Sequence, residues 1–418
     1  MKLLNYLFSF TLFLSSFLFG QYQFVQSPKN IKSIQLFNPQ SNDNTPLLQL
    51  GNGYLILSFD DLEAGYKRYQ YKIVHKNADW TDSNVFQSEY LEGYSTDFIK
   101  TYKNSFNTYQ RYTNYQLQIP NKDMRLKLSG NYELIVYLDN DDKPILTKRF
   151  AIYENRVDVA VRAERFVNGK NEWLNQRVQV QIASGTTNLT ETPDGAKLFI
   201  MKNNNWDDHL TNIQPQFSRS NQLTYNSPDL LFEGGSEYNW FDTKNLDVPA
   251  LTTEKTMRQD SVYYTFLRPN EPQYQFVYND FPDINGNFYI RTIRVGTELN
   301  AATEGDYTWV NFALDKFDDK NGALEVYIVG AFNDWQISAN NKMSIGDSGM
   351  LELDLYLKQG YYNYQYAVKD TKTGEVSQTY VDGSFWQTEN LYQALFYFRP
   401  WGIRYDLLVG YGEGNSRQ

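Results

Sequence analysis

Leu357-Lys-Gln-Gly-Tyr-Tyr-Asn-Tyr-Gln-Tyr-Ala-Val-Lys-Asp370 is the stretch that decides the fold. After Gly360, one set of alternate positions is filled by large rings and a branched residue, namely Tyr362, Tyr364, Tyr366 and Val368. Side chains two residues apart in an extended chain lie on the same face. The stretch therefore predicts a half-buried β-strand, and the polar turn over 369–374 predicts that this strand enters a hairpin.

A second copy of this pattern lies far upstream, in Leu128-Ser-Gly-Asn-Tyr-Glu-Leu-Ile-Val-Tyr-Leu-Asp139. Gly130 precedes Tyr132 by two residues, as Gly360 precedes Tyr362, and an apolar segment follows the next polar turn. We interpret each copy as the penultimate hairpin of an Ig-like sandwich, in which a tyrosine hydroxyl bonds back to the preceding chain. A hairpin of some other β-protein is the alternative.

Composition favours an all-β protein of more than one domain. The 418 residues exceed one ordinary domain, and the 34 Tyr, 27 Phe and 8 Trp suit pleated strands better than helices. The formal net charge of -10 argues against a partner that is a nucleic acid or an anionic membrane surface.

The N-terminus has the pattern of an export signal. Residues 1–20 begin Met-Lys, continue through a short apolar core and end at Gly20, which predicts a signal peptide removed before Gln21. No later run approaches the ~20 apolar residues of a membrane helix. The chain has no cysteine, so thiol catalysis and cysteine metal sites are excluded, and stability must come from large cores.

The strand patterns divide the mature chain into three tandem β-sandwiches of the Ig-like or E-set kind. We expect an N-terminal sandwich over 21–155, a middle sandwich with inserted loops over 156–300, and a C-terminal E-set-like sandwich over 301–418. The mixed polar and aromatic stretch 78–112 fits no clean period and is expected to be a long ordered loop.

Residues that could carry catalysis are scarce. His75 and His209 fall in different expected domains, outside any nucleophile-elbow or zinc-helix context. Adjacent aspartates such as Asp60-Asp61 are expected to punctuate loops; two facing carboxylates of a glycosidase are the alternative. Asp139-Asn-Asp-Asp142 could offer oxygen ligands to calcium, but a hairpin turn explains it more simply. We therefore expect no enzyme, no cofactor and no metal.

The C-terminal third contains Val326-Tyr-Ile-Val-Gly-Ala-Phe-Asn-Asp-Trp335, ahead of the Gly360 strand. It resembles the glycogen- and starch-binding modules of the E-set type, in which the tryptophan matching Trp335 stacks on a sugar. The segment 369–373 lacks the second tryptophan of that platform. An exported glycan-binding protein that uses Trp335 is therefore the alternative function.

Motifs in all three expected domains resemble the plug-protein family of the Bacteroidota type IX secretion system. They are Tyr71-Lys-Ile-Val-His-Lys-Asn-Ala-Asp-Trp80, Ser129-Gly-Asn-Tyr132, Gly234-Gly-Ser-Glu-Tyr-Asn-Trp-Phe-Asp242, Asp283-Ile-Asn-Gly286, Leu357-Lys-Gln-Gly-Tyr-Tyr-Asn-Tyr364, Asp382-Gly-Ser-Phe-Trp-Gln-Thr-Glu-Asn390 and Leu407-Leu-Val-Gly-Tyr411. The resemblance implies a non-enzymatic periplasmic protein that binds the inner opening of a giant outer-membrane β-barrel translocon and seals the idle pore. It implies a monomer within a larger complex, without a membrane span of its own.

Large aromatic side chains are the candidates for the docking surface, because they bury much area at low cost in side-chain entropy. The candidate interface residues are Trp80, Tyr90, Tyr94, Tyr109, Trp386 and Tyr392. Packing in a core is the alternative for each of them. An exported carbohydrate-active enzyme and an outer-membrane barrel are further alternatives; the predicted strands lack the lipid-facing apolar band of a barrel.

Overall fold

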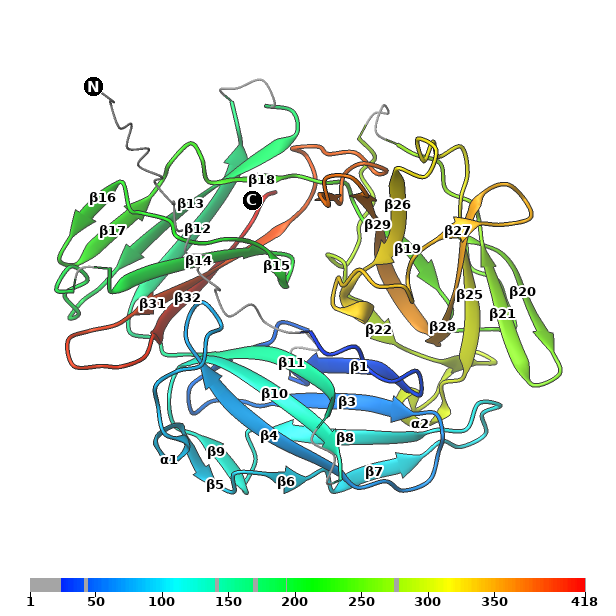
Figure 1. The fold of residues 1–418 in the computed structure, drawn as a ribbon, viewed down its shortest axis with the longest axis horizontal. Coiled ribbons are helices and arrows are strands. Elements are labelled where there is room, and N and C mark those ends of the chain that lie inside the picture. Colours follow the sequence, from blue (N-terminus) through cyan, green and yellow to red (C-terminus); the bar gives the residue numbers. More distant parts are fainter. Residues whose placement is uncertain are drawn as a thin grey trace, which may run out of the picture.

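The chain folds into three β-sandwich lobes that surround a common centre (Figure 1). The computed structural model describes residues 24–40, 44–139, 143–167, 172–192, 194–273 and 278–417. Strands dominate these residues, with only two four-residue helices and one 3-10 turn, so the prediction of an all-β fold is confirmed. The expected signal peptide and part of the Asp139–Asp142 turn lie outside the described residues.

The first lobe contains strands β1 to β11 and lies at the bottom of Figure 1. A four-stranded sheet packs on a five-stranded sheet, with Phe59 and Tyr132 in the core between them. The first sheet has the order β1 (Ile31–Phe37), β3 (Leu55–Asp61), β8 (Thr113–Ile119), β7 (Thr101–Asn104), and the second β2 (Leu47–Gln49), β11 (Pro144–Tyr153), β10 (Gly130–Leu138), β4 (Tyr69–Lys76), β6 (Asp97–Phe98).

The stretch 78–112, which we expected to be a loop, contributes short elements to this lobe. They are α1 (Gln87–Tyr90), β5 (Leu91–Gly93), β6 and β7, and β5 pairs with β9 (Met124–Leu126). Elements of two to four residues are too short to produce a periodic pattern in the sequence, which is why they escaped the prediction.

The second lobe combines segments from the middle and the end of the chain. Its inner core includes Val180 and Phe396. One sheet has the order β12 (Asp158–Arg165), β13 (Asn175–Ala183), β17 (Gln222–Tyr225), β16 (Phe217–Arg219), with β18 (Leu231–Glu233) also on β13, and the other has the order β15 (Asn205–Leu210), β14 (Ala196–Lys202), β31 (Leu391–Phe398), β32 (Leu407–Asn415).

The third lobe contains strands β19 to β30, with Phe312 and Tyr362 in its core. In one sheet, β29 (Gly360–Asp370) pairs with β19 (Asn239–Asp242), β22 (Phe288–Ile290), β26 (Leu324–Val329) and β30 (Val376–Ser377). The other has the order β20 (Thr253–Gln259), β21 (Val262–Leu267), β25 (Tyr307–Leu314), β28 (Leu351–Lys358), β27 (Ser344–Ile345). The remaining elements are the β23 (Ile293–Arg294) and β24 (Thr297–Glu298) pair, α2 (Ala301–Glu304) and the 3-10 turn η1 (Ala331–Asn333).

The two Gly-x-Tyr strands have the predicted tyrosine contact. The Tyr132 hydroxyl donates to the Leu128 carbonyl at 2.7 Å, and the Tyr362 hydroxyl donates to the Lys358 carbonyl, also at 2.7 Å. Both rings are fully buried. Each tyrosine thus fixes the chain where it enters a central strand, in the manner of the tyrosine corner of Ig-like sandwiches.

Beyond residue 155, the strand pairing divides the chain differently from the expected domains 156–300 and 301–418. The final strands β31 and β32 belong to the second lobe, where β31 pairs with β14, and β19 to β22 belong with the third lobe, as the colours of Figure 1 make visible. The reason is that β31 is apolar on both faces: Phe396 enters the core of the second lobe, while Tyr397 packs toward the first. Such a strand requires cover on both faces, and the core of the second lobe covers one face while the first lobe covers the other.

Candidate functional site

Three of the aromatic residues singled out in the sequence, Tyr90, Tyr392 and Trp335, are buried, and Trp80 is partly buried against the second lobe. Tyr90 is buried, with its hydroxyl donating to the Ile73 carbonyl at 3.2 Å, and Tyr392 is fully buried, with its hydroxyl 2.6 Å from Gln176 Oε1. Trp80 lies edge-on to Trp206 of the second lobe, with ring centroids 5.0 Å apart. Burial removes Tyr90 and Tyr392 from the set of surface candidates.

Trp335, the candidate sugar contact, is also packed inside. Only 8% of it is exposed, and its ring lies 5.6 Å from that of Tyr238. A Cβ built on Gly286 would stand 2.1 Å from the Trp335 ring, so the backbone there closes over the indole. A sugar needs an open aromatic face for stacking, and Trp335 offers none in this structure.

Three of the candidates remain at the surface. Tyr94 is 62% exposed and Tyr109 is 44% exposed, although the Tyr109 amide is held by Asp306 at 2.7 Å. Trp386 is partly buried beneath the Arg165 guanidinium, 5.0 Å from its ring centroid, and this guanidinium also lies 4.0 Å from the ring of exposed Trp173. The structure does not bring these three together into one site.

The first and third lobes are joined by a buried ion pair. Lys358 Nζ lies 2.6 Å from Asp60 Oδ2, with both side chains almost fully removed from solvent. The Tyr307 hydroxyl donates to the same carboxylate at 2.8 Å, and the Lys358 ammonium also lies over the Tyr112 ring. Burial lowers the pKa of Lys358, and the Asp60 carboxylate opposes this shift. We expected Asp60-Asp61 to mark a loop; they end β3 instead and form the junction.

The first and second lobes meet around Asp406, which is fully buried. Its carboxylate accepts from Lys197 Nζ at 3.0 Å, from Arg399 Nε at 2.9 Å and from the Ala78 amide of the first lobe at 3.1 Å. A carboxylate with several charged and backbone donors repays the cost of its desolvation better than an isolated one. Asp406 therefore ties the two lobes together.

The second and third lobes meet at a group of acidic residues near the C-terminus. Arg417, just after β32, lies 2.9 Å from Glu237 and 2.8 Å from Asp280. Burial raises the pKa of Glu237 to about 7, and burial likewise raises the pKa of Asp283 to about 7. This junction therefore holds carboxyl groups that change charge close to neutral pH.

This junction gives a testable pH dependence. An acid whose folded pKa lies above its unfolded pKa adds stability as the pH falls through the folded value, and the gain is complete below the unfolded value. For Glu237 that window runs from about 7 down to the ordinary 4.5. We expect the unfolding free energy, measured by urea titration at pH 8 and pH 5, to increase on acidification by on the order of 1–3 kcal/mol more than in Glu237→Gln. Equal pH profiles, or the same flattening by exposed Glu254→Gln, would contradict this assignment.

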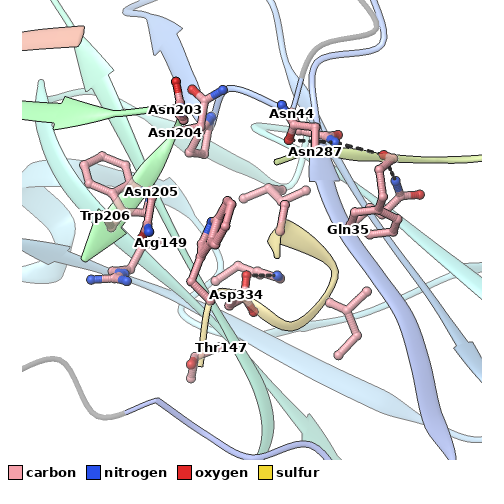
Figure 2. A pocket seen from close by; sticks show the side chains of 17 residues that line it. Gln35, Asn44, Thr147, Arg149, Asn203, Asn204, Asn205, Trp206, Asn287 and Asp334 are labelled. Carbon is pink, nitrogen blue, oxygen red and sulfur yellow. Dashed lines mark hydrogen bonds and ion pairs between the residues drawn. The ribbon is translucent and has the colours of Figure 1, made fainter. Parts of the chain in front are cut away.

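A small polar cavity lies where all three lobes come together (Figure 2). It measures about 80 Å³ and draws Asn44 from the first lobe, Asn205 from the second and Asn287 from the third. The Asn44 amide donates to Asn287 Oδ1 at 3.3 Å, and Lys148 of the first lobe pairs with Asp334 of the third at 2.5 Å. A space of this size holds a few water molecules rather than a substrate.

The two histidines do not form a catalytic pair. His75 is buried, with Nδ1 2.8 Å from Ser83 Oγ and Nε2 3.1 Å from the Ser129 carbonyl, and burial lowers its pKa. His209 is stacked on Phe199 in the second lobe. Among the described residues, no three His, Asp or Glu side chains are grouped so that they could hold a metal ion. The same residues include no helix with the length and apolar character needed to cross a membrane.

The fold and the contacts between the lobes define the class of this protein: an all-β protein of three packed sandwich lobes, joined by buried charged and polar side chains. Residues 31–154 match the family model described as the type 9 secretion system plug protein, first domain. The chain therefore belongs to the plug-protein family of the type IX secretion system. This is a structural, non-catalytic family associated with the cell envelope and its secretion machinery, so the chain takes part in type IX secretion as a plug-like protein.

A solved structure shares the whole fold. The crystal structure of a hypothetical protein from Parabacteroides merdae ATCC 43184 superimposes with a TM-score of 0.87 at 30% sequence identity, over 94% of this chain and 100% of that chain. E. coli α2-macroglobulin aligns at 7% identity over 91% of this chain and 26% of that chain, with a TM-score of 0.14, too low to support any argument. None of the curated proteins matches this chain.

Proposed function

We propose that this protein is a plug subunit that binds the periplasmic opening of an outer-membrane β-barrel translocon of type IX secretion and seals the idle pore. One observation carries the proposal beyond family membership: each pair of lobes is joined by buried polar contacts, including Lys358 to Asp60 and the Ala78 amide to Asp406. A body that occludes a wide pore must keep its shape against the flexing expected between loosely joined domains. The buried polar contacts between each pair of lobes meet this requirement.

An exposed aromatic patch on this body offers a docking surface. We define the aromatic patch as Phe86, Trp401, Ile403 and Arg404. Phe86 is 73% exposed and Trp401 is 76% exposed. Arg404 of the second lobe contacts the first lobe here, because it pairs with Glu89 at 2.7 Å and lies 5.8 Å from the Phe86 ring centroid. Tryptophan and arginine are enriched among the residues that dominate binding energy at interfaces.

The patch also has the fixed geometry that a docking surface needs. The Trp401 indole N–H donates to the Glu191 carbonyl at 2.9 Å, so the ring is anchored while most of it remains exposed. Large rings held in place lose little freedom on binding. Tyr94, Tyr109 and Trp386 stay secondary candidates for the docking surface.

Co-purification tests both the function and the surface. The tagged full-length chain, expressed in the native cells with residues 1–20 in place, should recover a large outer-membrane β-barrel protein from gently solubilised membranes. The double variant Phe86→Ser, Trp401→Ser should reduce this recovery by about tenfold or more, since two anchors are lost. The matched control is Leu251→Ser, Val295→Ser, which removes two apolar side chains of the third lobe that are 75% and 94% exposed.

The outcomes separate function from surface. A wild-type chain that is recovered only as a free monomer would count against the plug proposal itself. If the control variant lowers the recovery as much as the Phe86→Ser, Trp401→Ser variant does, the plug proposal stands, but the aromatic patch is not the docking surface.

A further inference from the structure

A groove of about 440 Å³ runs between the first and third lobes. One wall is formed by residues 24–34, which include the start of β1, and the other by Asp354–Leu357 of β28 and the loop that follows η1. Leu146, Phe288 and Phe332 supply apolar lining between these walls. The size lies within the range of ordinary ligand clefts.

The third-lobe wall of the groove is an open strand edge. On one side, β28 pairs with β25 along its whole length. On the other side, β27 covers only Leu351 and Glu352, and no other strand of the described residues pairs with β28. The N–H and C=O groups of every second residue from Leu353 to Lys358 are thus left without a strand partner, which is the arrangement that accepts an added strand.

The first-lobe wall contributes an uncompensated positive charge. Lys32 is partly buried and lines the groove, and within the described residues its ammonium makes no ion pair or hydrogen bond. Burial, and after it the neighbouring Lys29, lowers the pKa of Lys32. A partly desolvated cation without an anion costs stability, so the site favours a carboxylate brought from outside.

Four other charged side chains line the groove, namely Lys29, Lys148, Asp334 and Asp354. Lys148 pairs with Asp334 at 2.5 Å, and Asp354 accepts from the Asn311 side chain at 2.9 Å. Lys29 is exposed and has the same sign as Lys32. The amide of Asn311 does not neutralise Asp354, so three lysines stand against two aspartates and the lining carries a net charge of +1 beside the open strand edge.

We propose that this groove binds an extended acidic segment of a partner protein, which adds a strand to the free edge of β28 and places a carboxylate side chain against Lys32. Backbone hydrogen bonds to β28 would supply affinity, as in other cases of strand addition, and alternate apolar side chains would fill the space beside Phe332. Lys32 selects for a segment with a carboxylate side chain, because an ion pair in a partly desolvated groove is stronger than one in water. The inference goes beyond the plug proposal and does not depend on it.

Synthetic peptides test this binding mode with the full mature chain. The probe is a fluorescein-labelled nine-residue peptide with valine and threonine alternating around one central glutamate, and its glutamine counterpart is the control. Fluorescence anisotropy should show at least fivefold tighter binding of the glutamate peptide. Lys32→Met should abolish this preference, and Lys32→Glu should transfer it to a peptide with central lysine. N-methylation of the two amides that flank the glutamate should weaken binding at least tenfold, because a strand needs those donors.

Each contrary result overturns the proposal. Such results are equal affinity for the two peptides, no binding up to 1 mM, or a glutamate preference that survives Lys32→Met. A dimer that forms in sedimentation and blocks the peptide would identify a second copy of this chain as the occupant. Loss of binding in Lys32→Met would not be caused by misfolding, since this variant removes a desolvated charge and should raise the melting temperature of the chain.

Discussion

Lys358→Met should lower the free energy of unfolding by about 3–5 kcal/mol, because removal of one partner leaves a buried charge uncompensated. Asp60 would keep the Tyr307 hydroxyl at 2.8 Å but lose the ammonium at 2.6 Å, in a junction that solvent does not reach. Urea unfolding followed by far-ultraviolet circular dichroism measures the change. Because three lobes can unfold separately, calorimetry should accompany it to count the transitions.

A second variant separates the buried charge from the packing at this junction. The double variant Asp60→Asn, Lys358→Met leaves no charge behind, so it should be less destabilised than Lys358→Met alone. Lys316→Met is the matched control, since Lys316 pairs with Glu271 at 2.6 Å on the exposed surface and its loss should change the free energy of unfolding little. A loss below about 1 kcal/mol for Lys358→Met would show that the pair does not hold the lobes.

Gly412→Ala is expected to destabilise the chain by about 2–4 kcal/mol, because the added methyl group has no room. Gly410, Gly412 and Gly414 alternate along β32, on the face that meets β12. A Cβ on Gly412 would stand 2.1 Å from the Val159 carbonyl oxygen, which belongs to backbone and cannot turn aside. The three glycines therefore permit the close approach of β12 and β32 that closes the second lobe.

The neighbouring position provides the control for this prediction. Glu413 lies on the opposite face of β32 and is exposed, so Glu413→Ala should change the melting temperature little. Thermal unfolding of the two variants, recorded side by side, measures the contrast. Equal melting temperatures for Gly412→Ala and the wild-type chain would mean that β12 and β32 separate more easily than their spacing indicates.

The sequence identified only some of the aromatic residues that lie at the surface. Among the residues predicted to form the interface, Trp386, Tyr94 and Tyr109 reach the surface, whereas Tyr90 and Tyr392 are buried. A ring in an alternating strand has the same pattern whether its face meets solvent or another lobe. Phe86 and Trp401, the most exposed rings of the aromatic patch, gave no signal, because they lie in irregular segments.

The sequence by itself determined the local architecture of this protein. Alternation over Gly360–Asp370 and Gly130–Leu138 predicted two central strands, and the Gly-x-Tyr entry predicted the hydroxyl contacts of Tyr132 and Tyr362. These features depend on residues a few positions apart, whose geometry follows from the two-residue repeat of a strand.

Only the tertiary structure decided which strands share a sheet and which charges are buried. Strand β31 pairs with β14, nearly two hundred residues earlier in the chain, and Lys358 meets Asp60 across 298 residues. Lys358 occupies the face of β28 that alternation assigns to solvent, and the first lobe covers that face. The physical reason is that periodicity specifies that a face must be covered, whereas the identity of its cover depends on long-range packing.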